Sequence, residues 1–312
     1  MNYLKPKLTV DEQIKHMQSR GIRFNLCSEK EAVDYLFSKE NYFQVAAYRK
    51  LFAVRLGGDR SGEYADLDFA YLIDLSHIDK VLSRTVLPMT LDIENAAKMK
   101  IASQISENPD EDGYSIVTDF IGQMNETAQK GFRRVLKTRK HDEYCGALIK
   151  KYYDNMPIWV LLEIGSFGTL VDLYRFCAQR WNDQQMKDEH YRLKQVKAIR
   201  NSSAHSSCII NGFGNLEPTS IRLNPQVGKA LADTNIGAKA RKARLRNARM
   251  QQLVTLLYTY KEFVDDEVAL RETTKNIDLF FDEINKKVSY YKGNSLIKSS
   301  FDFLNRLFDN WF

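Results

Sequence analysis

The sequence is poor in the two residues that most often interrupt helices. It contains six prolines and 15 glycines in 312 residues, and both residue types normally mark turns and loops. Few breaks therefore divide the chain, which favours long helices over short strands joined by turns. Most apolar residues recur at spacings of three and four rather than two, so we predict an all-α protein.

Cysteine is also scarce. The sequence has four cysteines, with no CxxC pair and no histidine at metal-ligand spacing: Cys27, Cys145, Cys177 and Cys208. Such a pattern predicts neither a zinc site nor a disulfide framework. We expect no metal, and a reducing cytoplasm as the location of the protein.

Long apolar runs are missing as well. The sequence has no stretch of about 18 apolar residues, and its N-terminus lacks the apolar core of a signal peptide. The loop 57–62 contains three glycines, but it has neither the preceding strand nor the GK[ST] ending of a phosphate-binding loop. We therefore expect a cytoplasmic protein with no membrane segment and no cofactor.

The composition is that of an ordinary globular protein, with 44% hydrophobic and 28% charged residues. The formal net charge of +6 gives weak support to a polyanionic partner. The length predicts two lobes or one large domain. We divide the chain into an N-terminal helical region (1–150), a core region (151–216) and a C-terminal helical extension (217–312).

Several helices can be placed from local signals. Thr9 and Ser28 each precede a glutamate by three residues, and both pairs predict a capping box at a helix start. Apolar residues on one face of 68–105 predict a long amphipathic helix, which Pro88 should kink or divide. The apolar pattern of 301–312 predicts a terminal helix docked on the core or on a partner subunit.

The segment 157–173 is nearly uninterrupted apolar sequence and predicts one deeply buried helix. Glu163 lies inside it, four residues from both Trp159 and Phe167, so its side chain should face an apolar wall. A buried carboxylate must find a partner or lose its charge. Two interpretations stay open: a hydrogen bond that joins helices, or a catalytic carboxylate that orients an arginine or a histidine.

The clearest chemical group follows the next predicted helix, 188–199. Asn201 and His205 are four residues apart, so both side chains project from one face if the turn stays helical, and Arg200 precedes them. Arginine binds phosphate with a permanent charge, and histidine titrates near neutrality. This group predicts RNA cleavage without a metal, in which His205 transfers a proton and Arg200 stabilises charge on the phosphorane. One histidine cannot easily serve as both acid and base, so we predict a composite site across the two-fold axis of a homodimer.

An arginine and a histidine near a helix end more often form a cap or a surface pair. A second pair, Arg134 and His141, lies in a basic run and lacks a polar residue after the arginine. For this second pair we favour contact with an RNA backbone or a solvated helix face.

Several blocks of the sequence together resemble one bacterial family. The blocks are Leu8–Ile14 followed by Arg20–Gly21, Asn41–Phe43 leading to Tyr48 and Phe52, Ile93–Asn95, Pro157–Glu163 and Phe167–Gly168. With them the chain resembles the abortive-infection (Abi) family of bacterial phage-resistance proteins, of the AbiD and AbiF type, over most of its first 215 residues.

The resemblance implies a HEPN-like helical bundle with additional N-terminal and C-terminal helices, in which an Arg-x4–6-His motif marks the ribonuclease site and dimerisation completes it. It makes Arg200 the motif arginine, Asn201 the polar residue that follows and His205 the motif histidine, with Glu163 as a further candidate. It also implies an RNA substrate and, since some relatives work beside a structured non-coding RNA, a regulatory RNA partner. Related HEPN toxins often carry a tyrosine two residues after the histidine, where modification silences them. Ser207 occupies that position here, so we do not expect silencing of this kind.

The last third of the chain matches the family pattern poorly. It contains a basic run with six cations in eleven residues: Lys239, Arg241, Lys242, Arg244, Arg246 and Arg249. Such a run is usually a solvated helix face. Because a ribonuclease needs RNA contacts, we predict that this run binds phosphate in a manner that is sensitive to salt and blind to sequence.

Two functions follow from these observations. The first is a metal-independent endoribonuclease that acts in anti-phage defence by abortive infection and cleaves RNA through attack of the 2′-hydroxyl. The alternative is a non-catalytic RNA-binding or partner-binding helical protein of a defence or toxin–antitoxin system, in which the same residues only hold phosphate. Replacing His205 by alanine separates the two, because only the first has cleavage to lose.

Overall fold

The computed structural model describes residues 6–215 and 217–312. Within these residues the chain consists of α-helices and short 3-10 helices, and strand-like pairing is limited to two isolated bridges. The predicted all-α class is confirmed. None of the described helices is both long and apolar enough to cross a membrane.

The chain forms two compact units that are each discontinuous in sequence. Unit 1 comprises residues 1–89, 198–258 and 266–312, and unit 2 comprises residues 90–197 and 259–265. Three helices contribute to both units: α4 (Phe69–Glu107), α10 (Gln184–Ala204) and α13 (Ala248–Phe263).

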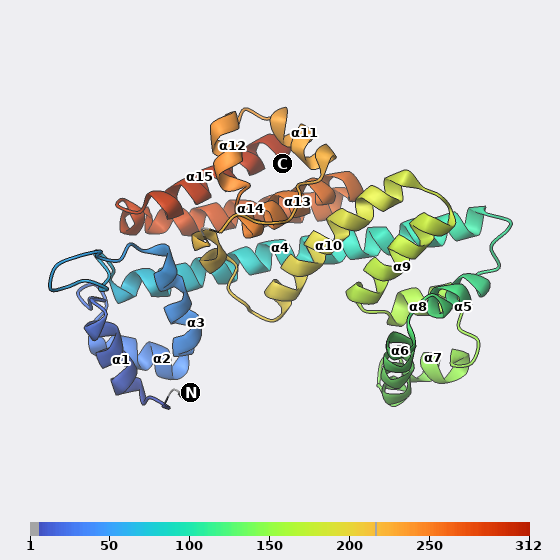
Figure 1. The fold of residues 1–312 in the computed structure, drawn as a ribbon, viewed down its shortest axis with the longest axis horizontal. Helices are drawn as coiled ribbons and strands as arrows, with labels where there is room; N and C mark the ends of the chain where they lie inside the picture. Colours follow the sequence, from blue (N-terminus) through green and yellow to red (C-terminus); the bar gives the residue numbers. More distant parts are fainter. Residues whose placement is uncertain (1–5, 216) are drawn as a thin grey trace. The chain divides into compact units, whose positions relative to one another are not determined.

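The helices that lie wholly in unit 1 come from both ends of the chain (Figure 1). They are α1 (Val10–Ser19), α2 (Glu29–Ser38), α3 (Tyr42–Ala47), α11 (Pro225–Ala232), α12 (Ala238–Arg244), α14 (Glu267–Lys286) and α15 (Ser295–Trp311), with the 3-10 helices η1 (Tyr48–Leu51), η2 (Ile210–Gly214) and η3 (Val288–Tyr291). Those wholly in unit 2 are α5 (Ser115–Gly122), α6 (Glu126–Arg139), α7 (Gly146–Tyr152), α8 (Ile158–Ile164) and α9 (Phe167–Arg180).

Both predicted capping boxes are present. Thr9 N donates to Glu12 Oε2 at 2.7 Å, and Glu12 N donates back to Thr9 Oγ1 at 3.3 Å. Ser28 and Glu31 exchange the same pair of bonds at the start of α2. Each box satisfies backbone donors that a helix start leaves without partners, which is why these two helix starts could be placed from the sequence.

Helix α4 realises the amphipathic segment predicted over 68–105. Its apolar stripe is buried in unit 1 at Leu72, Leu75, Ile78 and Leu82. Pro88 lies inside the helix and does not divide it, although proline removes one backbone donor from the hydrogen-bond ladder. The boundary between the two units follows directly, at Met89.

Three aspartates are buried, Asp68 directly before α4 and Asp74 and Asp79 on its unit 1 part, and they hold segments that are remote in sequence. Asp68 accepts a hydrogen bond from Asn25 N at 2.9 Å. Asp74 accepts one from Tyr291 Oη at 2.5 Å, and Asp79 accepts one from Tyr48 Oη at 2.7 Å. A carboxylate is costly to bury unless its oxygens accept hydrogen bonds. Each aspartate therefore fixes its partner segment to α4, and Asp79 also fixes the segment that carries the predicted site.

Helix α14 runs antiparallel to the unit 1 part of α4, alongside it (Figure 1). His77 Nε2 lies 3.1 Å from Glu283 Oε2, and Thr85 Oγ1 donates to Asn276 O at 3.2 Å. The predicted terminal helix is α15, and its apolar face is buried in unit 1. Helices from the C-terminal third thus complete the core around α4.

Unit 2 corrects the prediction of one buried helix over 157–173. Helix α8 ends at Ile164 and α9 begins at Phe167. Gly165 between them is extended, with ψ 143°, and Ser166 caps α9 by accepting a bond from Thr169 N at 3.1 Å. A serine N-cap competes with helix continuation, and this signal was hidden by the surrounding apolar residues.

A buried glutamate, Glu189 on α10, organises the polar part of unit 2. Lys100 Nζ donates to Glu189 Oε2 at 2.7 Å, Gln185 Nε2 donates to Oε1 at 2.9 Å, and the hydroxyl of Tyr174 donates to Oε2. A cation and two neutral donors together offset the desolvation of the carboxylate.

Candidate active site

The predicted motif lies at the C-terminal end of α10, within unit 1. The helix ends at Ala204, and His205 N still donates to Asn201 O at 3.1 Å. The turn therefore stays helical as far as His205, and Asn201 and His205 are both exposed. The predicted condition for projecting both side chains from one face is met.

Arg200 is only partly exposed. Its Nη1 lies 3.5 Å from Asn201 Oδ1, at the limit of a hydrogen bond. Its Nε is buried and has no hydrogen-bond partner among residues 6–215 and 217–312. A guanidinium has five donors in a fixed plane, and because the buried Nε is closed to a phosphate, phosphate contacts fall to the Nη donors.

A Schellman motif terminates α10 around His205. Ser207 N donates to Ser202 O at 2.8 Å, and Ser206 N donates to Ser203 O at 3.2 Å. Ser206 has φ 52°, the left-handed conformation that glycine usually adopts in this motif. A serine there costs of the order of 1 kcal/mol and persists when its surroundings hold it.

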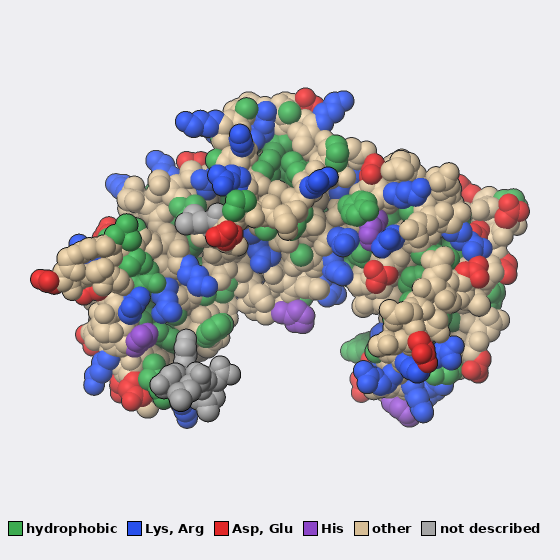
Figure 2. All heavy atoms as spheres, viewed as in Figure 1, with side chains coloured by type: hydrophobic (Ala, Val, Ile, Leu, Met, Phe, Trp, Pro, Cys, Tyr) green, Lys and Arg blue, Asp and Glu red, His purple; other side chains and the backbone are tan. Residues whose placement is uncertain are grey.

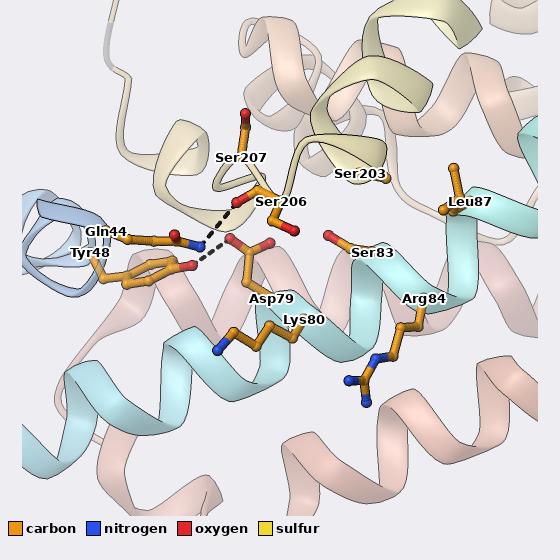
Figure 3. Close-up of a pocket in the computed structure, with 10 residues that line it drawn as sticks. All are labelled: Gln44, Tyr48, Asp79, Lys80, Ser83, Arg84, Leu87, Ser203, Ser206 and Ser207. Atoms are coloured by element: carbon orange, nitrogen blue, oxygen red, sulfur yellow. Dashed lines mark hydrogen bonds between the residues drawn. The ribbon is translucent and has the colours of Figure 1, made fainter. Parts of the chain in front are cut away.

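Side chains from distant parts of unit 1 supply that support. Gln44 Nε2 donates to Ser206 O at 3.0 Å (Figure 3). Beyond the turn, Asp79 accepts from Ile209 N at 2.8 Å and from Ile210 N at 3.2 Å. The segment that follows His205 is therefore attached on both sides of the turn.

Asp79 is the main electrostatic feature beside the motif. It is 3% exposed, and burial raises the pKa of its carboxyl from 3.8 to about 6 against the opposing effect of bonds from Tyr48, Ile210 and Ile209. The charge of Arg249 also favours the ionised form, while burial lowers the pKa of that guanidinium. Arg249 Nη1 in turn donates to Ser202 Oγ at 3.4 Å, on the last turn of α10.

A pocket of about 290 Å³ lies between α4 and the turn. It is lined by Asp79, Lys80, Ser83, Arg84 and Leu87 of α4, by Gln44 and Tyr48, and by Ser203, Ser206 and Ser207 of the turn. Figure 3 shows the hydroxyls of Ser83 and Ser206 pointing toward one another. The residues on either side of His205 in the sequence thus form part of a pocket wall.

Glu163 does not have the environment that was predicted for it. The expectation of a buried carboxylate on an apolar wall is wrong, because Glu163 is exposed on α8, and Trp159 one turn earlier is 52% exposed. Glu163 belongs to unit 2, whereas Arg200 and His205 belong to unit 1. The burial that supported a catalytic role for Glu163 is absent, and the role itself stays a prediction.

The basic run divides into two groups. Lys239, Lys242 and Arg246 are exposed, and Lys and Arg side chains gather over α12 (Figure 2). The other three contact the protein, with Arg241 Nη1 donating to Ile236 O at 2.5 Å, Arg244 Nη1 to Ser300 Oγ at 2.8 Å and Arg249 Nη1 to Gln252 Oε1 at 2.9 Å. Burial lowers the pKa of Arg244 and of Arg249. Half of the run thus supports the fold of unit 1.

The second arginine–histidine pair has different surroundings, in unit 2. Arg134 lies on α6, which buries only Leu136, and His141 lies in the turn after it. Both side chains are exposed, and Lys and Arg side chains gather over α6 and α7 (Figure 2). The pocket between α5 and α6 is lined by Arg133 and not by Arg134 or His141.

Sequence reasoning missed Asp79, Tyr48 and Ser83 as neighbours of the motif. One signal was present: Asp79 lies four residues after Leu75 and three before Leu82, so it falls on the apolar stripe of α4. A carboxylate at such a position must be buried and paired. Its partners could not be read from the sequence, because they lie 31 and 130 residues away.

Comparison with known proteins gives one match. A family model described as Abi-like protein matches residues 35–211. No match was found among curated proteins or among solved structures. The matched segment includes Asp79 and the whole of Arg200–His205, and it ends before the basic run. Since the model covers more than half of the chain, the protein belongs to the family of Abi-like proteins.

Proposed function

We propose that this Abi-like protein is an endoribonuclease whose active site is the end of α10, and that it serves defence by abortive infection. Membership of the family points to abortive infection. The observation that carries the ribonuclease assignment is the fixed turn that presents His205 and Asn201 beside the partly free guanidinium of Arg200. Preorganised groups of this kind stabilise a transition state without reorganisation.

The chemistry needs no metal. His205, acting as base, accepts the proton of a ribose 2′-hydroxyl, and the 2′-oxygen attacks the adjacent phosphorus. Arg200 stabilises the charge on the phosphorane oxygens. The bond from phosphorus to the 5′-oxygen then breaks, an acid protonates that oxygen, and the products carry a 2′,3′-cyclic phosphate and a 5′-hydroxyl.

The acid and the base cannot both be the single His205 of one chain in the same step. A second copy related by a two-fold axis places a second His205 opposite the first. We propose that the active form is a homodimer with one composite site. The exposed cations of the basic run, Lys239, Lys242 and Arg246, contribute phosphate contacts that do not depend on sequence.

Digestion of total RNA and of tRNA in the presence of EDTA tests this proposal. Wild type should cut RNA and leave 2′,3′-cyclic phosphate ends. Arg200→Ala and His205→Ala should remain folded and cut about 10²–10⁴-fold more slowly. If the wild type cuts no faster than these variants, even with extract of infected cells added as a source of trigger, the chain is instead the non-catalytic binding protein.

A further inference from the structure

The pocket beside the turn is built by the same residues that frame His205. Ser203 precedes His205 by two residues and Ser206 follows it, and both line the pocket. The pocket and His205 are therefore held by the same turn, although His205 itself does not line the pocket. The rest of the wall comes from α4 and from the Gln44–Tyr48 segment, which are fixed to the turn by hydrogen bonds.

The charges of the wall argue against a phosphate in the pocket. Asp79 contributes a carboxylate to the wall, and Lys80 Nζ is already 2.5 Å from Glu40 Oε2. Figure 3 shows the charged ends of Lys80 and Arg84 extending along α4, away from the facing hydroxyls of Ser83 and Ser206. A second anion would be repelled there, whereas neutral donors and acceptors would not.

The neutral groups of the wall suit a nucleoside. Serine hydroxyls both donate and accept, and the Gln44 side chain offers an amide. Ser203 is 7% exposed, and its hydroxyl has no hydrogen-bond partner among residues 6–215 and 217–312. Because this oxygen has almost no exposed surface, the hydroxyls of Ser83 and Ser206, which face one another, are the groups placed to bond the edge of a ligand.

The size of the pocket limits the ligand to one nucleoside. Pockets for drug-sized ligands measure roughly 300–1,000 Å³, and this one, at about 290 Å³, is slightly smaller than that range. RNA is read most often through unpaired nucleotides whose bases are turned out of the stack. A single extruded base with its ribose matches both the volume and the hydrogen-bonding groups.

Resting on the ribonuclease assignment above, we propose that this pocket binds the base and ribose of one unpaired nucleotide of the RNA substrate, adjacent to the cleaved bond. The pocket then determines which base precedes or follows the cut. The charged ends of Lys80 and Arg84 lie on the α4 side of the pocket and contact the phosphates of the RNA strand where it leaves the pocket.

Binding of free nucleosides tests the pocket without any need for cleavage. The probes are adenosine, guanosine, cytidine and uridine, each measured by saturation-transfer NMR with the full chain. Ser83→Leu fills the pocket from α4, Ser83→Ala removes only the hydroxyl, and Asn95→Leu places the same leucine at an exposed position of α4 that does not line the pocket.

At least one nucleoside should bind to wild type and to Asn95→Leu with equal affinity. Ser83→Leu should weaken that binding at least tenfold, and Ser83→Ala about threefold to tenfold, as expected for one lost hydrogen bond. Should no nucleoside bind, or should all variants bind equally, the pocket proposal is overturned. Thermal unfolding of each variant shows whether it is folded, and the Ser83→Ala result decides if Ser83→Leu is not.

Sequencing of cleavage sites gives a second, separate readout. Wild type should prefer one or two bases at a fixed position beside the cut, and Ser83→Leu should lose this preference through a raised KM with kcat much less affected. Cleavage with no base preference and no nucleoside binding refutes the pocket alone. Nucleoside binding at Ser83 without any cleavage supports the pocket and refutes the ribonuclease.

Discussion

The chain carries two arginine–histidine pairs, and the structure surrounds them in different ways. Arg200 and His205 lie in unit 1, on a turn whose backbone is held by Gln44 and Asp79. Arg134 and His141 lie in unit 2, on an exposed helix and the turn that follows it. Spacing alone therefore does not identify a site, because catalysis requires groups that other residues hold in place.

Beside each pair, an aspartate accepts hydrogen bonds from backbone N–H groups that follow the histidine in the sequence. Asp79 is buried and reaches Ile209 and Ile210 from another helix. Asp142 is exposed and reaches Tyr144 N at 2.9 Å and Cys145 N at 3.0 Å within its own turn. The first aspartate ties the turn to the core, and the second forms only a local turn.

Replacement of these aspartates should have the largest effect. Asp79→Ala leaves the amides of Ile209 and Ile210 and the hydroxyl of Tyr48 without their acceptor, and should lower the free energy of unfolding by about 2–4 kcal/mol. Asp142→Ala should cost clearly less, since water replaces its bonds. Denaturant titration of the two variants measures the difference, and equal losses would contradict the contrast drawn between the two turns.

The pH dependence of stability should have opposite signs for the two aspartates. The folded-state pKa of Asp79, about 6, lies above its ordinary value of 3.8. The contribution of this carboxyl to the free energy of unfolding is therefore fully present below pH 3.8 and is lost as the pH rises through 6. The difference of about two pKa units corresponds to at most about 3 kcal/mol. Bonds from Cys145 and Tyr144 lower the pKa of Asp142, so its contribution is present above the ordinary carboxyl pKa and is lost as the pH falls.

Denaturant unfolding from pH 3 to pH 8 checks both signs. The free energy of wild type relative to Asp79→Asn should fall between pH 4 and pH 6. Relative to Asp142→Asn it should fall only toward the acidic end. If the difference in free energy of unfolding between wild type and Asp79→Asn stays constant from pH 4 to pH 6, the buried carboxyl titrates normally.

Conservative replacement of the arginines should separate the pairs in activity. Lysine keeps the charge but not the planar set of donors that binds two phosphate oxygens at once. Arg200→Lys should therefore reduce kcat about tenfold to a hundredfold, and Arg134→Lys should leave it within about twofold. Steady-state cleavage of one RNA substrate measures both, and a larger loss for Arg134→Lys would move the site to unit 2.

Mixed dimers should give the smallest but most specific effect. If two copies of His205 form one site, only dimers of two wild-type chains cut, and at equal amounts of wild type and His205→Ala these are about a quarter of all dimers. Co-expressed mixtures should therefore retain about a quarter of the wild-type rate. A rate of about one half would show that each chain has a complete site, and mixtures with His141→Ala provide the control.

The parts of the fold that were predicted correctly depend on local signals. The capping boxes at Thr9 and Ser28, the amphipathic helix α4 and the terminal helix α15 all follow from neighbours within a few residues. The error at 157–173 arose because apolar residues on both sides of Gly165 and Ser166 concealed a helix end. Glu163 was then given a buried environment that a single long helix would have required.

The candidate site was predictable only in part. Arg200, Asn201 and His205 share a helical turn, so their spacing was sufficient to bring them together. The pocket depends on contacts between Gln44, Ser83 and Ser206 across as many as 162 residues, and no local pattern encodes such contacts. The role of Arg244 was missed for the same reason, since its acceptor Ser300 lies 56 residues away, whereas Arg241 donates to Ile236 O only five residues before it.

The most direct test measures RNA cleavage in EDTA by wild type, His205→Ala and His141→Ala side by side. We predict that His205→Ala cuts at least about a hundredfold more slowly than wild type and that His141→Ala cuts as wild type does. Loss of cleavage in His141→Ala with full activity in His205→Ala would contradict it and place the chemistry on the turn after α6.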